Sequence, residues 1–263
     1  RAMQDPNIDH GVRFDWGRAS ADYARYRDIY PPAFYDALIS RGLCTAGQRV
    51  LDLGTGTGVL PRALYRYSAD FTGVDAAPAQ IEQAKRHAAQ GGMDIRFFCA
   101  RAEDCRFPEG SFDAVTACQC FVYFDHAALA PLLHRWLRPG GRFAVLYMAW
   151  LPGEDEIAAR SEELILRCNP AWTGCGETRR PIAVPPDYDG YFVRETQQVF
   201  DLPVQFSREG WHGRIRACRG VGASLDSDAL ARFDAEHRAL LARTAPPEFD
   251  VLHYAAVTIL RRA

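Results

Sequence analysis

The stretch that decides the fold is Val50-Leu-Asp-Leu-Gly54-Thr-Gly56-Thr-Gly58, in which an apolar run leads into closely spaced glycines. The short apolar run over residues 49–53 predicts a buried strand. A helix is expected directly after the glycines, over residues 59–67. Glycine allows positive φ and lets a ligand approach the main chain closely. The stretch therefore predicts a strand, a tight turn that suits a ligand, and a helix.

The spacing of these glycines differs from the dinucleotide-binding fingerprint G-x-G-x-x-G, whose third glycine packs the helix on the strand beside a pyrophosphate. Here the order is G-x-G-x-G, and Val59 follows Gly58. A glycine turn can also be a purely structural connection between a strand and a helix. A second signal is therefore needed before the turn is assigned to a ligand.

That second signal is Asp75, which ends the next short apolar run, Phe71-Thr-Gly-Val74. In nucleotide-binding α/β folds, a carboxylate at this strand end accepts hydrogen bonds from both ribose hydroxyls. The alternative is that Asp75 only caps the helix that follows. Its position at a strand end after a glycine turn favours the ligand role.

Strand and helix patterns alternate through the first 150 residues. Helices broken at Pro31-Pro32 are expected within residues 14–40. Further strands are expected over residues 95–99, 113–117 and 142–148, and further helices over residues 78–90 and 127–137. This alternation predicts a parallel sheet with helices on both faces.

The pattern changes after Trp150, where proline and glycine become frequent. Helices are expected over residues 155–167, 211–219 and 226–244, and strands over residues 193–206 and 251–260. The segment from 151 to 224 is rich in Trp, Tyr and Arg. An apolar pocket with a few polar anchors is the usual form of a small-molecule site, so we expect this segment to bind the substrate.

The composition limits the possible partners of the chain. Its 263 residues are 48% hydrophobic and 24% charged, and the net charge is −2. This balance argues against a nucleic-acid backbone as a partner, because such partners favour a basic surface. No run approaches the roughly 20 apolar residues of a membrane span, so no membrane partner is expected. The oligomeric state is left open.

Cysteine and histidine spacing argues against a metal site. None of the eight cysteines forms a C-x-x-C pair. The seven histidines show no H-x-H or H-x-x-x-H spacing, although zinc sites usually combine such ligands. We therefore expect no metal, reduced thiols and a cytoplasmic location.

Several motifs follow one another in a recognisable order: Val50–Gly58, Gly73–Asp75, Ala100–Asp104, Phe107–Asp113, Gln119–Asp125 and Leu137–Phe143. With this order, the chain resembles the class I S-adenosylmethionine-dependent methyltransferases, of the small-molecule, ubiquinone/trans-aconitate-methyltransferase-like type. The resemblance covers residues 14–148. It implies an α/β fold with a doubly wound, mostly parallel, seven-stranded, Rossmann-like sheet and a cap inserted after strand five.

The resemblance divides the chain into four parts by role. Residues 1–40 would form N-terminal lid helices, and residues 41–150 the donor-binding core. Residues 151–224 would form the acceptor cap. Residues 225–263 would supply a C-terminal helix and a strand that completes the core sheet.

The cofactor implied by the resemblance is S-adenosyl-L-methionine. Gly54, Thr55 and Gly56 would line its methionine half. Asp75 would hold the ribose diol, and Ala76 would lie at the adenine edge.

Further donor contacts follow from the later motifs. Gln80 would pack against adenine or bond to it, and the Ala102 main chain and the Glu103 side chain would lie near it. Arg101 stands where the family commonly has an Asp that accepts from the adenine amine, and arginine has no acceptor. Gln119 would lie under the sulfonium.

The stretch Tyr23-Ala-Arg-Tyr-Arg27 resembles the lid helix of the family, in which Tyr and Arg approach the donor carboxylate. Tyr23 and Arg27 are therefore assigned to the donor, and Tyr23 also to the reaction centre. The alternative is an amphipathic surface helix with aromatic anchors.

The function expected from these motifs is methyl transfer to a small molecule by in-line displacement. The alternatives are a nicotinamide-dependent oxidoreductase and a non-catalytic nucleotide-binding module. The glycine spacing and Leu137-Arg-Pro-Gly-Gly141 disfavour the oxidoreductase. The run Ala117-Cys-Gln-Cys120 lacks the Asp/Asn-Pro-Pro-Tyr signature of enzymes that methylate nucleobase amines, which favours a small acceptor. The accepting atom is left open among O, N, S and C.

His212 is the first candidate for proton transfer from the acceptor, because histidine titrates near neutral pH. The flanking Gly210 and Gly213 are expected to leave its surroundings open to a ligand. Tyr23 and Tyr147 are rival polar groups. The alternative for His212 is a histidine that bonds to a main-chain carbonyl or to solvent.

Overall fold

The structure is a computed structural model that describes residues 2–26 and 29–263, and of residues 23 and 24 only the main chain. It divides into two compact units. Unit 1 comprises Arg1–Pro31, Ala149–Arg179 and Asp201–Tyr254, and unit 2 comprises Pro32–Met148, Arg180–Phe200 and Ala255–Ala263. The four-part division by role stays a prediction.

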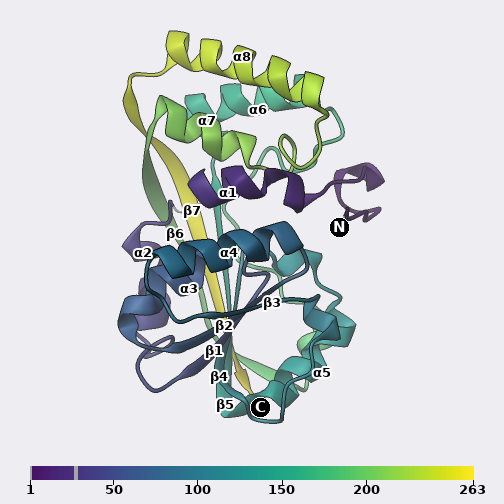
Figure 1. The fold of residues 1–263 in the computed structure, drawn as a ribbon, viewed down its shortest axis with the longest axis vertical. Helices are drawn as coiled ribbons and strands as arrows, with labels where there is room; N and C mark the ends of the chain where they lie inside the picture. The colour runs from purple at the N-terminus through teal and green to yellow at the C-terminus, as the bar shows by residue number, and fades with distance from the viewer. Residues whose placement is uncertain (1, 27–28) are drawn as a thin grey trace. The chain divides into compact units, whose positions relative to one another are not determined.

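A seven-stranded sheet has the order β3-β2-β1-β4-β5-β7-β6 (Figure 1). The strands are β1 (Arg49–Leu53), β2 (Asp70–Asp75), β3 (Arg96–Cys99), β4 (Phe112–Cys118), β5 (Leu137–Trp150), β6 (Phe192–Ser207) and β7 (Glu248–Arg262). The pairs β1–β2, β1–β4, β2–β3 and β4–β5 are parallel. The predicted α/β class with this sheet is confirmed.

Helices connect most of the strands, as the alternation predicts, and two further helices precede β1. They are α1 (Ser20–Tyr26), α2 (Pro32–Ile39), α3 (Val59–Leu64), α4 (Pro78–Gln90), α5 (His126–Trp136), α6 (Glu156–Cys168), α7 (Arg208–Arg216) and α8 (Ser227–Thr244). Among the described residues, no helix is long and apolar enough to cross a membrane.

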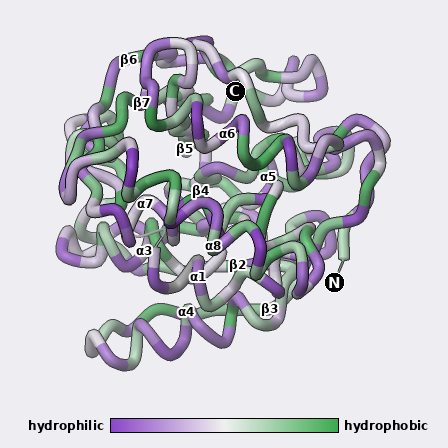
Figure 2. Tube along the Cα trace, turned by 90° about the horizontal axis from the view of Figure 1, so that it is seen from above, coloured by the Kyte–Doolittle hydropathy of each residue, from purple (hydrophilic) through white to green (hydrophobic). Residues whose placement is uncertain are grey.

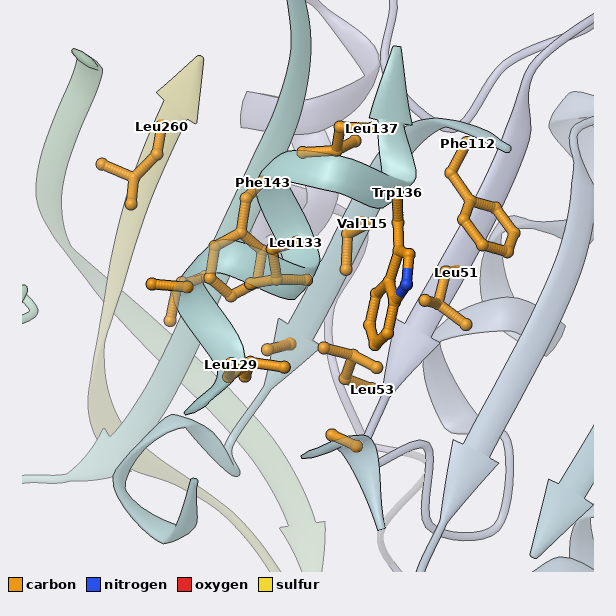
Figure 3. Packing of buried hydrophobic residues seen from close by; sticks show 14 of the residues in the cluster. Leu51, Leu53, Phe112, Val115, Leu129, Leu133, Trp136, Leu137, Phe143 and Leu260 are labelled. Carbon is orange, nitrogen blue, oxygen red and sulfur yellow. The ribbon is translucent and has the colours of Figure 1, made fainter. Parts of the chain in front are cut away.

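One face of the sheet in unit 2 is covered by α5. Leu129, Leu133 and Trp136 recur at helical spacing and are at most 1% exposed. They pack with strand residues such as Leu53 and Phe143 in one cluster (Figure 3). The helix begins where the Asp125 carboxylate accepts a hydrogen bond from the Ala128 N–H.

The opposite layer is formed by α4, which packs its Ile81, Ala84 and Ala88 against Phe97 of β3. Hydrophobic residues recur along this helix between hydrophilic ones (Figure 2), as expected of a helix with one buried side. The phenyl ring of Phe97 also lies against Gly58, where a Cβ atom would come within 2.8 Å of it. Gly58 therefore lets the glycine turn pack closely on β3.

Unit 1 is mainly helical, with α7 packed on α1 and α8, and α6 packed on α8. Helix α7 begins at Arg208, three residues before the predicted start, because the Ser207 hydroxyl accepts from the Gly210 N–H as an N-cap. A Cβ atom on Gly213 would lie 2.3 Å from the Tyr26 ring. Gly213 thus allows close packing of α7 on α1.

We predict that Gly58→Ala destabilises the protein more than Gly47→Ala does. Both glycines have positive φ, so both substitutions carry backbone strain, but only Gly58 contacts Phe97. The strain costs about 1–2 kcal/mol, and the overpacking at Gly58 adds about 1–3 kcal/mol. Urea unfolding of the two variants measures the difference. Equal losses would show that Phe97 moves aside freely.

Candidate functional site

The glycine turn after β1 has an open side at its centre. Gly54, Gly56 and Gly58 have φ of 60°, 57° and 74°, in the left-handed region that favours glycine. A Cβ atom on Gly54 would lie 2.6 Å from the Cys120 sulfur, whereas one on Gly56 would have no neighbour within 4 Å. Gly54 therefore packs against the protein, and Gly56 is the position that a ligand can approach.

Asp75 connects this turn to the end of β2. One of its carboxylate oxygens accepts from the Gly56 N–H at 2.9 Å, and the other accepts from the Ala77 N–H at 2.9 Å. Ala77 precedes the first turn of α4, so the carboxylate also stabilises the start of that helix. Burial raises the pKa of Asp75, and both main-chain bonds counteract that shift. A carboxylate can accept about four hydrogen bonds, so Asp75 can accept further bonds from a ligand.

Asp52 lies beneath the turn and was not singled out by the sequence analysis. It is 2% exposed, and its carboxylate accepts from the Thr116 hydroxyl at 2.7 Å. Burial raises its pKa to about 7. The available signal was an acidic residue within an otherwise apolar strand, since buried carboxylates require partners.

The residues predicted to contact adenine differ in their accessibility. Ala76 is exposed, whereas Gln80 and Ala102 are buried. The Glu103 carboxylate accepts from the Asp125 N–H at 2.8 Å and lies 3.5 Å from the exposed Arg101 guanidinium. Glu103 thus supports the start of α5 and pairs with the arginine that departs from the family pattern. Its predicted role at adenine stays a prediction.

Gln119 follows β4 directly and has a φ of 67°. Its amide nitrogen donates to the Met148 carbonyl, and its amide oxygen accepts from the Met148 N–H, both at 2.7 Å. Both polar atoms of the side chain therefore bond to β5. The predicted position of Gln119 under the sulfonium stays a prediction.

The lid residues can be followed only in part. Arg27 and the Tyr23 side chain lie outside the described residues. The main chain around Tyr23 forms α1, and Asp22 on that helix accepts from the Arg216 guanidinium of α7 at 2.9 Å. Tyr147, the third candidate for catalysis, is half-buried near the end of β5.

His212 is not open to a ligand, contrary to the prediction. It is 1% exposed, and its Nδ1 lies 2.8 Å from Nδ1 of His237. The neighbouring Gly213 creates no free space, because the Tyr26 ring occupies it. The predicted catalytic role therefore has no support from the accessibility of His212, and it stays a prediction.

A chain of polar contacts in unit 1 encloses these two histidines. The Trp211 indole can only donate, and it bonds to the Ser161 hydroxyl at 3.0 Å, which lies 3.0 Å from Nε2 of His237. Nε2 of His212 lies 3.2 Å from the Asp234 carboxylate. These contacts place the Trp211, Ser161, His237, His212 and Asp234 side chains in one row within unit 1. Their enclosure by other side chains supports a structural role.

The described residues contain no group of three or more His, Cys, Asp or Glu side chains that could hold a metal ion. The candidate site consists of the glycine turn, the carboxylates of Asp52 and Asp75, and the strand end at Gln119. All of these belong to unit 2.

Residues 50–141 match a family model described as a methyltransferase domain. The demethylmenaquinone methyltransferase of Thermus thermophilus is 42% identical over 104 residues, which make up 38% of this chain and 47% of that protein. The ubiquinone biosynthesis O-methyltransferase of Xanthomonas oryzae pv. oryzae is 31% identical over 137 residues, or 51% of this chain and 57% of that protein. The chain thus spans about half the length of these curated relatives.

Solved structures share the fold. The YcgJ protein from Bacillus subtilis aligns with a TM-score of 0.53 at 22% identity, covering 88% of this chain and 99% of that one. A structure described by the conversion of a disulfide bond into a thioacetal group during echinomycin biosynthesis also aligns with a TM-score of 0.53 at 22% identity, covering 88% and 81%. Residues 50–141 match a methyltransferase domain, and the resemblance to class I methyltransferases is confirmed for this part of the chain.

We predict that the buried histidines destabilise the protein as the pH falls from about 6.5 towards 4, while the raised pKa of the buried Asp52 carboxyl makes an opposing contribution over the same range. Burial lowers the pKa of His212, that of His237 to about 3 and that of His253 to about 4. Over this range the unfolded chain binds protons that the folded chain does not, so unfolding is favoured by about 1.4 kcal/mol per pH unit for each such histidine.

The test compares the wild-type protein with His253→Phe, because His253 stacks on Phe206 and a phenyl ring can keep that contact. Urea unfolding between pH 4.5 and 6.5 should show less destabilisation by acid in the variant than in the wild type, a difference of about one proton. Parallel curves would mean that His253 takes up a proton in the folded protein.

Proposed function

We propose that the protein is an S-adenosylmethionine-dependent methyltransferase that acts on a small-molecule acceptor. The proposal extends the assignment of residues 50–141 to the activity of the whole chain. By their names, one of the relatives above methylates demethylmenaquinone and the other acts in ubiquinone biosynthesis, which supports a small organic acceptor. The −2 net charge agrees with an acceptor other than nucleic acid.

The observation that carries the proposal is the pairing of the Asp75 carboxylate with the open glycine turn. The donor fits these residues: the space at Gly56 admits a ligand against the main chain, and Asp75 keeps acceptor capacity beside it. In this proposal Asp75 binds the ribose diol, while Gly54, Thr55 and Gly56 line the methionine half.

When bound, the donor supplies a methyl group that its sulfonium has already activated. The task of the chain is then to align and desolvate the two reactants, which can contribute several kcal/mol to lowering the barrier. Asp75 holds the ribose. The glycines of the turn carry no side chains that would keep the donor away from the main chain. In such folds, ligands bind at the carboxyl ends of the parallel strands. The glycine turn, Asp75 and Gln119 lie at the carboxyl ends of β1, β2 and β4, respectively.

Tyr147 is the best-placed of the three candidate groups for the acceptor. It lies three residues before the end of β5 and is half-buried. A half-buried phenol can bond to an acceptor, whereas His212 is enclosed and the Tyr23 side chain lies outside the described residues. We propose that Tyr147 positions the acceptor.

We predict that S-adenosylmethionine and its demethylated product raise the melting temperature, and that NAD does not. A ligand at a concentration of about 100 times its Kd stabilises the folded protein by about 2.7 kcal/mol. Differential scanning fluorimetry with each compound tests this. Stabilisation by NAD alone would refute the proposed function in favour of an oxidoreductase.

We further predict that Asp75→Ala weakens donor binding by about tenfold or more, because two ribose hydroxyls lose a charged partner. Asp70→Ala is the matched control, since Asp70 begins the same strand and its carboxylate pairs with Arg96 at 2.8 Å. Titration calorimetry with the demethylated donor gives both affinities. If Asp75→Ala binds as the wild type does, Asp75 only organises the turn and the start of α4.

A further inference from the structure

The main chain leaves the β4–β5 ladder at Gln119. The parallel register is regular up to the pair of Cys118 with Leu146, and the Gln119 N–H still donates to the Leu146 carbonyl at 2.9 Å. In a regular parallel ladder, the Met148 N–H would next bond to the carbonyl of residue 119, and the Met148 carbonyl to the N–H of residue 121. Neither bond forms, because the chain turns at Gln119.

The Gln119 side chain makes both missing bonds. Its amide oxygen accepts from the Met148 N–H and its amide nitrogen donates to the Met148 carbonyl, each at 2.7 Å. An amide side chain has the same donor and acceptor groups as a peptide unit. The strand β5 therefore remains paired at Met148 although the main chain of β4 has departed.

The turn brings Cys120 against the glycine loop. Its sulfur lies 3.2 Å from the Leu53 carbonyl, at the end of β1. It also fills the space beside Gly54, where a Cβ atom would lie 2.6 Å away. Burial raises the pKa of the Cys120 thiol, so the sulfur is present as a neutral S–H donor. Cys120 therefore packs directly against Gly54, the first glycine of the turn.

We propose that Gln119 is a positioning residue: by replacing the main chain at Met148, it allows the turn that places Cys120 under Gly54, and so it sets the shape of the donor-binding loop. The effect on the donor rests on the proposed function. The effect on Cys120 does not, which keeps the two proposals separable.

Two substitutions test the role of the amide. Gln119→Met keeps the length of the side chain and removes both bonds at every pH. Gln119→Glu keeps the acceptor but gains a donor only when it is protonated. The carboxylate would face the Met148 carbonyl, which favours the protonated form and restores both bonds in mild acid.

The first readout is the affinity for the demethylated donor, measured by calorimetry at 15 °C between pH 5.5 and 8.5. We expect Gln119→Met to bind about five- to tenfold more weakly than the wild type at every pH. We expect Gln119→Glu to show a similar loss at pH 8.5 and near-wild-type affinity at pH 5.5. Gln90→Glu adds the same charge at the exposed end of α4 and should leave the affinity ratio to the wild type unchanged with pH.

The second readout is the rate at which iodoacetamide labels Cys120, mapped by mass spectrometry on the folded protein. Release of the turn should expose the thiol, so Gln119→Met should be labelled about tenfold faster than the wild type, while labelling of the exposed Cys99 stays the same. If Gln119→Met is labelled faster than the wild type but the wild type does not bind the donor, the proposed function is refuted and the role of Gln119 stands.

Other outcomes overturn the proposal. Wild-type affinity and labelling in Gln119→Met would show that the amide does not hold the turn, and an affinity ratio for Gln119→Glu that is flat with pH would exclude the paired bonds. If Gln119→Met does not fold, Gln119→Glu prepared at pH 5.5 decides the matter. Failure of that variant to fold or to bind the donor at pH 5.5, where the wild type binds it, also counts against the proposal.

Discussion

The hydrogen bond from the Gly56 N–H to the Asp75 carboxylate is the interaction on which the candidate site depends. It joins the turn after β1 to the end of β2, two strands whose register already pairs Leu53 with Val74. Burial of a carboxylate is costly unless hydrogen bonds compensate for the lost water. The turn supplies one such bond and the start of α4 supplies the other, so the carboxylate holds the glycine loop in one conformation.

Local sequence signals predicted the alternating strands and helices of unit 2, whereas the seven-stranded sheet was implied by the family resemblance. The apolar runs that became β1, β2 and β4 are short and bounded by turn residues, and Pro78 with Gly91 marks the limits of α4. Strand ends were less predictable. β5 runs from Leu137 to Trp150, well beyond its apolar centre, because pairing with neighbouring strands stabilises residues whose own pattern indicates a turn.

The candidate site was predictable in its residues but less so in their partners. Asp75 was assigned from its position at a strand end, which is a local property. The two bonds from Gln119 to Met148 span 29 residues, and the bond from Glu103 to the Asp125 N–H spans 22. The periodicity of the sequence does not predict hydrogen bonds between residues that lie so far apart in the chain. The same reason explains why the expected openness around His212 was wrong: the neighbouring Gly213 allows helix packing against Tyr26 rather than access for a ligand.

Asp75, Glu103 and Gln119 share one physical property: each bonds a main-chain group with a polar side chain at a strand end or a helix start. At these points the regular main-chain bonding of the sheet and helices stops, and buried N–H groups would otherwise lack partners. Side chains that satisfy them lock the loops that a ligand must contact. Among the three, Asp75 combines unused carboxylate acceptor capacity with the open space at Gly56, and this combination is the reason that we propose this edge of the sheet for the ribose-bearing donor.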